Sequence, residues 1–248
     1  TITYNSPDVK GPNGEDRRGK IWGGLVPYGL SENNFGTAAK IPWRAGANEN
    51  TTISLSHDVL VEGKLLSAGT YGLHMIPGKE KWTIIFSRNS TAGGSYFYNE
   101  KEDALRVDVI PKSSPFSEWL TYEFIERMPD YTIAALKWEE LMVPFKISAE
   151  VNRFYVDKIR QELQNSPGFS WKNWVEAVRF CINQNINLAE AVLWAEYSIN
   201  GPFIGERNFE TISTKALLFY KLSREKEADG LVAEAISLPD ATMTLIHT

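Results

Sequence analysis

The chain has 248 residues, of which 43% are hydrophobic and 23% charged, and this excludes an intrinsically disordered chain. The formal net charge of −5 disfavours a nucleic-acid partner, because phosphate backbones require clustered Lys and Arg. No apolar run approaches the roughly 20 residues that a membrane span needs. The single cysteine, Cys181, excludes an internal disulfide and a cysteine-based zinc site, and we expect no cofactor.

The segment from residue 5 to residue 50 is rich in glycine and proline and has little hydrophobic periodicity. An irregular stretch of this length is uncommon unless it is functional or packs over another element. We therefore expect it to form a long irregular lid.

The chain after this lid alternates between apolar and polar residues, as half-buried strands do. Three consecutive strands are predicted over residues 119–127, 131–138 and 141–147. Further apolar positions alternate in three sets: Tyr71, Leu73 and Met75; Trp82, Ile84 and Phe86; Leu105, Val107 and Val109. Many short strands without intervening helices predict an antiparallel β-sandwich or barrel-like domain over residues 1–148.

After residue 147 the hydrophobic period changes from 2 to 3.6, which predicts helices. One helix is expected over residues 149–164, and others are expected to begin near Trp171, Leu188, Glu210 and Glu225. A shift of 37 residues superimposes the last two helices on the preceding two, which resembles tetratricopeptide repeats. The fold class is thus α+β in two segregated parts, with helical hairpins over residues 149–248 that we expect to contact a protein partner.

Four spaced strings in the first part carry a family resemblance: GLVPYG at 24–29, WRAGANE at 43–49, AGTYGLHMIP at 68–77 and WTIIF at 82–86. Together they resemble a family of exported bacterial proteins known only as a domain of unknown function, over residues 1–147. Members of that family often continue into helical repeats. The resemblance implies an export signal upstream of Thr1 and a periplasmic or cell-surface location, and it supplies no activity or catalytic residues.

Arg44, Asn48 and Glu49 lie at the end of the irregular segment and allow two interpretations. An Arg fork and a carboxylate five residues apart could bind a polar ligand. Alternatively, a buried Arg44 donates hydrogen bonds to Glu49 or to backbone carbonyls and ties the long loop to the sheet.

His74 shares a strand face with Gly72, whose missing side chain leaves room above the imidazole for a ligand. The alternative is a polar side chain on a half-exposed face. Only His57 and His247 could join it in a metal site, so a three-histidine zinc site is not expected and we predict no metal.

Other polar groups and the aromatic residues bear on function. The carboxylates of Glu100, Glu102, Asp103, Glu139 and Glu140 are expected to be solvated. Several aromatic residues fall in or near loops, where rings can stack on sugars or pack the lid: Trp22, Tyr28, Trp43, Tyr96 and Tyr98.

Three functions remain open at this point. The first is a non-catalytic binding module of the cell envelope for a small polar ligand or glycan, with a ligand site at Trp43, Arg44, Asn48, Glu49 and His74. The second is a hydrolase of envelope glycans or peptides that uses Glu49 and His74. The third is a structural envelope protein without a ligand.

Overall fold

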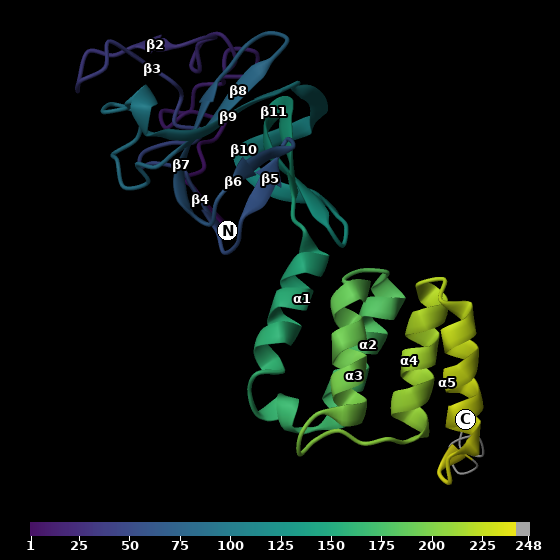
Figure 1. The fold of residues 1–248 in the computed structure, drawn as a ribbon. Coiled ribbons are helices and arrows are strands. Elements are labelled where there is room, and N and C mark those ends of the chain that lie inside the picture. Colours follow the sequence, from purple (N-terminus) through teal and green to yellow (C-terminus); the bar gives the residue numbers. More distant parts are fainter. Residues whose placement is uncertain (242–248) are drawn as a thin grey trace. The chain divides into compact units, whose positions relative to one another are not determined.

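The computed structural model describes residues 1–241 and divides into two compact units, residues 1–150 and a second unit that begins at Val151 (Figure 1). The first unit contains antiparallel β-sheets and the second contains helices. The predicted α+β class with segregated parts is confirmed. Residues 242–248, which include His247 and the end of the predicted helical part, lie outside the described residues.

Two main sheets and a small ribbon form the first unit. The five-stranded sheet has the order β1 (Ile2–Thr3), β4 (Thr52–Leu55), β7 (Gly69–Ile76), β8 (Trp82–Ser87) and β9 (Asp103–Val109). The four-stranded sheet has the order β10 (Lys112–Arg127), β11 (Tyr131–Ser148), β5 (Val59–Val61) and β6 (Lys64–Leu66). The ribbon pairs β2 (Ser31–Glu32) with β3 (Lys40–Ile41), and a 3₁₀ turn, η1 (Glu100–Glu102), precedes β9.

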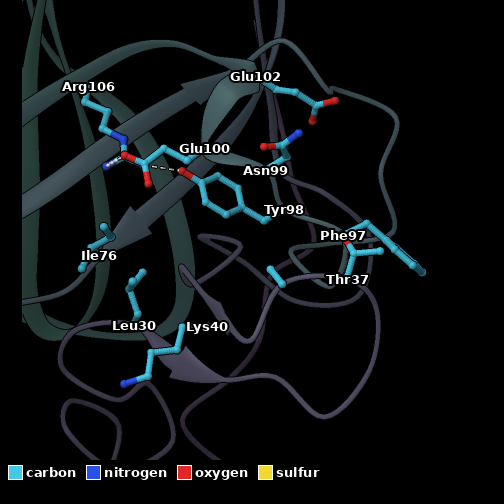
Figure 2. Close-up of a pocket in the computed structure, with 11 residues that line it drawn as sticks. Leu30, Thr37, Lys40, Ile76, Phe97, Tyr98, Asn99, Glu100, Glu102 and Arg106 are labelled. Atoms are coloured by element: carbon cyan, nitrogen blue, oxygen red, sulfur yellow. Dashed lines mark hydrogen bonds and ion pairs between the residues drawn. The ribbon is translucent and has the colours of Figure 1, made fainter.

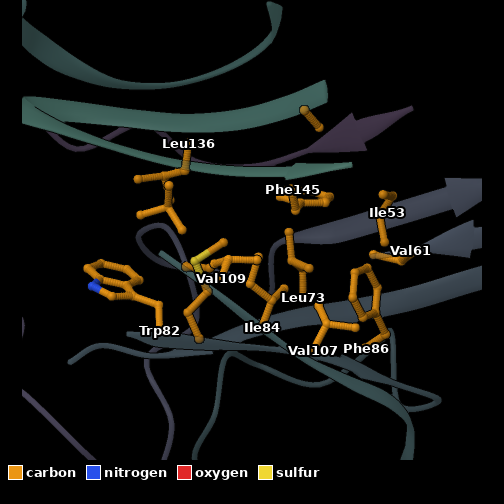
Figure 3. Close-up of a cluster of buried hydrophobic side chains, with 14 of the residues drawn as sticks. Ile53, Val61, Leu73, Trp82, Ile84, Phe86, Val107, Val109, Leu136 and Phe145 are labelled. Carbon is orange, nitrogen blue, oxygen red and sulfur yellow. The ribbon is translucent and has the colours of Figure 1, made fainter. Parts of the chain in front are cut away.

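The hydrophobic core lies between the two main sheets (Figure 3). Alternate residues of each strand point inward, as the period of two predicts. From β8 these are Trp82, Ile84 and Phe86, and β11 contributes Leu136 and Phe145 from the facing sheet. Burial of these large apolar side chains is the main source of stability for the sandwich.

The predicted break at Glu139-Glu140 is wrong, because β11 continues through it as one strand. Glu139 has a left-handed backbone with φ of 56° and lies at a register shift between β10 and β11. The extra residues lie in β10, which advances by four residues on each side of Ser117 while β11 advances by two. Such a bulge bends paired strands without reversing the chain. The chain therefore kinks at this position where the sequence predicts a turn.

The irregular segment is held by the hydrophobic core as well as by polar contacts. Val9, Ile21, Val26 and Ala45 are buried and belong to the main core cluster. The segment also runs beside the edge strand β10, where the Val9 amide donates to the Glu118 carbonyl. It is thus anchored at several points along its length.

The second unit contains five α-helices and one 3₁₀ turn among the described residues. These are α1 (Val151–Glu162), η2 (Ser166–Phe169), α2 (Trp171–Gln184), α3 (Leu188–Asn200), α4 (Phe209–Lys221) and α5 (Glu225–Ser237). Helix α2 packs on α3, and α4 packs on α5, so the predicted hairpins are present (Figure 1). Their likeness to tetratricopeptide repeats stays a prediction.

Small residues lie where these helices approach closely. Ala191 and Ala228 are fully buried, which matches their equivalent positions in the sequence repeat.

Cys181 is also buried, and burial raises the pKa of its thiol to about 11, so the thiol stays protonated at neutral pH. Among the described residues, no helix combines the length and apolar character that crossing a membrane requires.

Candidate functional site

A pocket of about 510 Å³ opens on the first unit beside strand β9 (Figure 2). Tyr98 and Arg106 lie at one wall, and Leu30 and Lys40 come from the opposite side. The other lining residues are Thr37, Ala38, Ile76, Phe97, Asn99, Glu100 and Glu102. The pocket thus combines aromatic surface with charged and amide groups, and part of its wall belongs to the irregular segment.

The wall at Tyr98 is a closed hydrogen-bonded cluster. The Tyr98 hydroxyl donates to Asp103 Oδ2 at 2.7 Å and accepts from Arg106 Nη2 at 2.6 Å. Arg106 Nε also donates to Asp103 Oδ2 at 2.6 Å, and Arg106 Nη1 lies 3.2 Å from Glu100. These contacts fix the phenol and the guanidinium in place before any ligand arrives.

A β-bulge brings the members of this cluster together. Strand alternation alone would place Asp103 and Arg106 on opposite faces of β9, since they are three residues apart. The pairing with β8 skips Ala104, because Phe86 pairs with Leu105 and Ser87 pairs with Asp103. The extra residue turns the Asp103 side chain to the face that Arg106 occupies.

Burial strongly affects the acidic groups of the cluster. The Asp103 side chain is 8% exposed, and loss of solvent raises its pKa against the opposing hydrogen bonds from Tyr98 and Arg106. Burial is also the main cause that raises the pKa of Tyr98, followed by its hydrogen bond to Asp103. At neutral pH the phenol is therefore protonated, and its one proton is donated to Asp103.

His74 lies behind this wall and is buried, which corrects the prediction of a half-exposed face. Its ring is 2% exposed, its Nδ1 lies 2.8 Å from Ser95 Oγ, and its ring packs edge to face on Tyr98. The segment that carries Ser95 and Tyr98 covers this face of β7. Burial, followed by the charge of Arg44, lowers the pKa of His74 to about 4, so the imidazole is neutral.

The space above Gly72 that the sequence suggested is filled by protein. A Cβ at Gly72 would lie 2.6 Å from Asn50 Nδ2 and from the Asn89 carbonyl, and 3.3 Å from His74 Nε2. The amide of Asn50 donates to the Asn89 carbonyl at 3.2 Å. Glycine is thus required here for close packing of polar groups, and the room above His74 is too small for a ligand.

Arg44 is half-buried, whereas its sequence context predicts a largely buried side chain. Its Nη1 donates to the Asn48 carbonyl at 2.8 Å. A backbone carbonyl was one of the two predicted acceptors, and the Glu49 carboxylate was the other. Its Nη2 lies 3.3 Å from the Tyr96 hydroxyl, and its Cζ lies 5.1 Å from the centre of the Tyr96 ring. Arg44 therefore contacts the same loop that supplies Tyr98 to the pocket.

Glu49 does not take the role of a partner for Arg44. It is exposed, and its Oε2 accepts from Asn5 Nδ2 at 2.6 Å, so the loop tie runs to the start of the chain. Asn48 is exposed with a left-handed backbone and contributes its carbonyl. The structure thus brings Arg44 to Asn48 but gives Glu49 and His74 different partners.

Trp43 belongs to a cluster of four indoles rather than to an exposed platform. Its ring stacks on Trp138 at 6.4 Å between centroids and packs edge to face on Trp22 and Trp82. The ring is half-buried and lies against the main core. Trp43 therefore packs the irregular segment onto the sandwich.

Most of the pocket residues are not predictable from the sequence pattern. Glu100 is solvated as expected, with its side chain 76% exposed, although it and the half-buried Glu102 also line the pocket. Asp103 corrects the expectation of a solvated charge, since its side chain is 8% exposed behind the pocket wall. Glu139 is buried too and accepts from the amide of Gly19. The useful signal in the sequence was the aromatic residues predicted in loops, since Tyr98 lines the pocket and Tyr96 contacts Arg44.

Within residues 1–241, no group of three or more His, Cys, Asp or Glu side chains is arranged to hold a metal ion.

The first unit is an antiparallel β-sandwich with a pocket formed partly by its long irregular segment, and helical hairpins follow it. The model of the family described as "Protein of unknown function (DUF2911)" matches residues 1–147, more than half of the chain. The chain belongs to this family, which confirms the expected match to a domain of unknown function over residues 1–147. No curated protein and no solved structure matches the chain.

Proposed function

We propose that the first unit is a non-catalytic binding module that holds a small polar ligand, of the glycan class, in the pocket beside Tyr98. The pocket of about 510 Å³ falls within the size range of small-molecule sites. The wall at Tyr98 and Arg106 carries this proposal, because a polar wall that is already held by its own hydrogen bonds, next to apolar surface, loses little freedom when a ligand binds. We place this activity in the cell envelope, following the family resemblance.

The aromatic rim of the pocket supports the glycan class. Phe97 lines the pocket and packs edge to face on Phe35 at 5.8 Å, and both rings are exposed. A flat exposed ring offers its face to the C–H groups of a sugar, while Asn99 and Glu102 offer polar partners at the same opening.

The geometry gives less support to the hydrolase alternative. A glycan hydrolase needs two groups that reach one scissile bond. Glu49 is exposed and holds Asn5, whereas His74 is buried behind Tyr98 with a lowered pKa. A neutral, enclosed imidazole is a weak base and has no route to a bulky substrate.

The second part of the proposal is that the helical hairpins bind a protein partner. Large apolar side chains are exposed on three of these helices, at Leu193, Leu217 and Ile236. Exposed apolar side chains mark a protein interface where they join into one contiguous patch.

Isothermal titration calorimetry of the full chain with neutral oligosaccharides, N-acetylglucosamine oligomers included, tests the pocket. We expect Phe97→Ala to weaken binding about fivefold, since loss of one stacked ring corresponds to about 1 kcal/mol. Phe116→Ala is the matched control, because Phe116 and Phe97 are both 47% exposed and Phe116 is not a pocket residue. Equal weakening by the two variants, or no heat with any oligosaccharide, would contradict the proposed pocket.

A further inference from the structure

Arg44 is a half-buried cation whose hydrogen-bond partners are neutral. Its guanidinium donates to the Asn48 carbonyl and to the Tyr96 hydroxyl. Among the described residues, no carboxylate pairs with it. The five N–H groups of a guanidinium exceed these two acceptors, so donors remain for another partner.

Two neighbouring groups pack against the Arg44 guanidinium and orient it. The ring of Tyr96 lies against it, and Gly94 packs on it as well: a Cβ there would lie 3.1 Å from Nη1 and 3.3 Å from Cζ. Gly94 has a left-handed backbone with φ of 77°. Backbone and ring thus hold the group in one orientation, as preorganised recognition requires.

Other part-buried arginines of the chain have acidic partners. Arg106 pairs with Asp103 and Glu100, and Arg160 bonds Glu190 through two nitrogens, at 2.8 Å and 2.7 Å. Removal of a charge from water is costly without a counter-charge. The lowered pKa of His74, which the charge of Arg44 reinforces after burial, agrees with a cation that is not neutralised nearby.

We infer that Arg44, held by Tyr96 and Gly94, is a binding site for the carboxylate group of a small acidic ligand. A carboxylate presents two oxygens in one plane and matches the fork of a single guanidinium. A phosphate usually takes several cations or a nest of backbone amides, and this site offers one guanidinium. Arg44 is not among the residues of the pocket beside Tyr98, so this site is independent of the proposed glycan site.

Matched acidic and neutral probes test the inference, since the carboxylate could come from an acidic sugar or an acidic amino acid. We would titrate the full chain by NMR or calorimetry with the pairs glucuronate and glucose, and glutamate and glutamine. At least one acid should bind about tenfold more tightly than its neutral partner, and higher salt should reduce the difference. The pair that shows the preference identifies the source of the carboxylate.

Variants assign this preference to Arg44. Arg44→Gln should abolish it, and Arg44→Lys, which keeps the charge without the fork, should fold and retain at most a small part of it. Arg18→Gln is the control, since Arg18 is an exposed arginine paired with Asp16. An acid preference that survives Arg44→Gln, equal binding within both pairs, or tighter binding of inorganic phosphate than of either acid would overturn the inference.

Discussion

Arg106 and Arg44 are both part-buried arginines in the same sandwich unit, yet their surroundings are opposite. Arg106 is enclosed by two carboxylates and a phenol, and every group of that cluster restrains another. Arg44 meets a backbone carbonyl, a phenol and a glycine. The charge of Arg106 is neutralised by carboxylates of the protein, and the cluster stabilises the fold. The charge of Arg44 is not neutralised by any carboxylate within residues 1–241, so it can pair with a ligand.

Residue type and burial do not by themselves distinguish a structural arginine from a binding one. The presence of a counter-charge distinguishes the two, because a desolvated cation needs a negative charge, either from the protein or from a ligand. Both arginines are tied to one short segment, since Tyr96 contacts Arg44 and Tyr98 contacts Arg106. The structural arginine and the proposed binding arginine therefore share one loop.

The largest expected effect concerns pH and His74, which lies beside both arrangements. Its pKa is about 4 in the folded chain and about 6.5 when unfolded, so between these values the unfolded chain binds the extra proton. The contribution of the neutral His74 to the free energy of unfolding is fully present above pH 6.5. The free energy of unfolding then falls by about 3 kcal/mol as the pH approaches 4. Chemical unfolding at pH 4 to 8 measures it.

The variant His74→Gln should lose this part of the pH dependence, whereas His57→Gln should keep it because His57 is exposed. Arg44→Gln should make the fall in stability smaller and end it at a higher pH, because loss of the Arg44 charge raises the folded-state pKa of His74 toward its unfolded value. This effect should be weaker than that of removing His74, since burial is the larger cause of the lowered pKa. Indistinguishable pH profiles for the wild type and His74→Gln would contradict the buried neutral imidazole.

Loss of the Arg106 charge comes next. Arg106→Gln leaves the buried Asp103 carboxylate with the Tyr98 hydroxyl alone and should lower the free energy of unfolding by about 2–3 kcal/mol. The expected loss is below that of a fully buried pair because the Arg106 side chain is 35% exposed. Hydrogen exchange should assign the change to residues 1–150. A loss below about 0.5 kcal/mol would show that the cluster is not structural.

Gly72 gives a smaller effect of a different origin. Gly72→Ala forces its Cβ against Asn50 and the Asn89 carbonyl and should cost about 1–3 kcal/mol through overpacking. Gly93→Ala is a suitable control, since a Cβ at Gly93 meets no atom within 4 Å and its φ is not in the left-handed region. Equal thermal midpoints for the two variants would refute the close packing at Gly72.

Sequence periodicity predicted the sheets and helices well because it depends on neighbouring residues. The alternation of Trp82, Ile84 and Phe86 marked β8, and the change of period marked the start of the helices. It failed at Glu139, where a left-handed residue kinks one strand that the pattern divides into two. A polar pair is as compatible with a bulge as with a turn.

The sites were less predictable because their contacts join distant parts of the chain. Short spacing suggested that Arg44 pairs with Glu49, yet Glu49 holds Asn5, 44 residues away. His74 is buried by a loop 21 residues later. Asp103 and Arg106 share a face only through a bulge opposite β8, which the alternation of β9 does not reveal.

The unfolding free energies of Arg44→Gln and Arg106→Gln, measured side by side without any ligand, test the distinction between the two arginines most directly. The account predicts a loss below about 1 kcal/mol for Arg44→Gln, because its partners are neutral and half-exposed, and a clearly larger loss for Arg106→Gln. Equal losses, or a greater loss for Arg44→Gln, would make Arg44 a structural tie and contradict its assignment to a ligand.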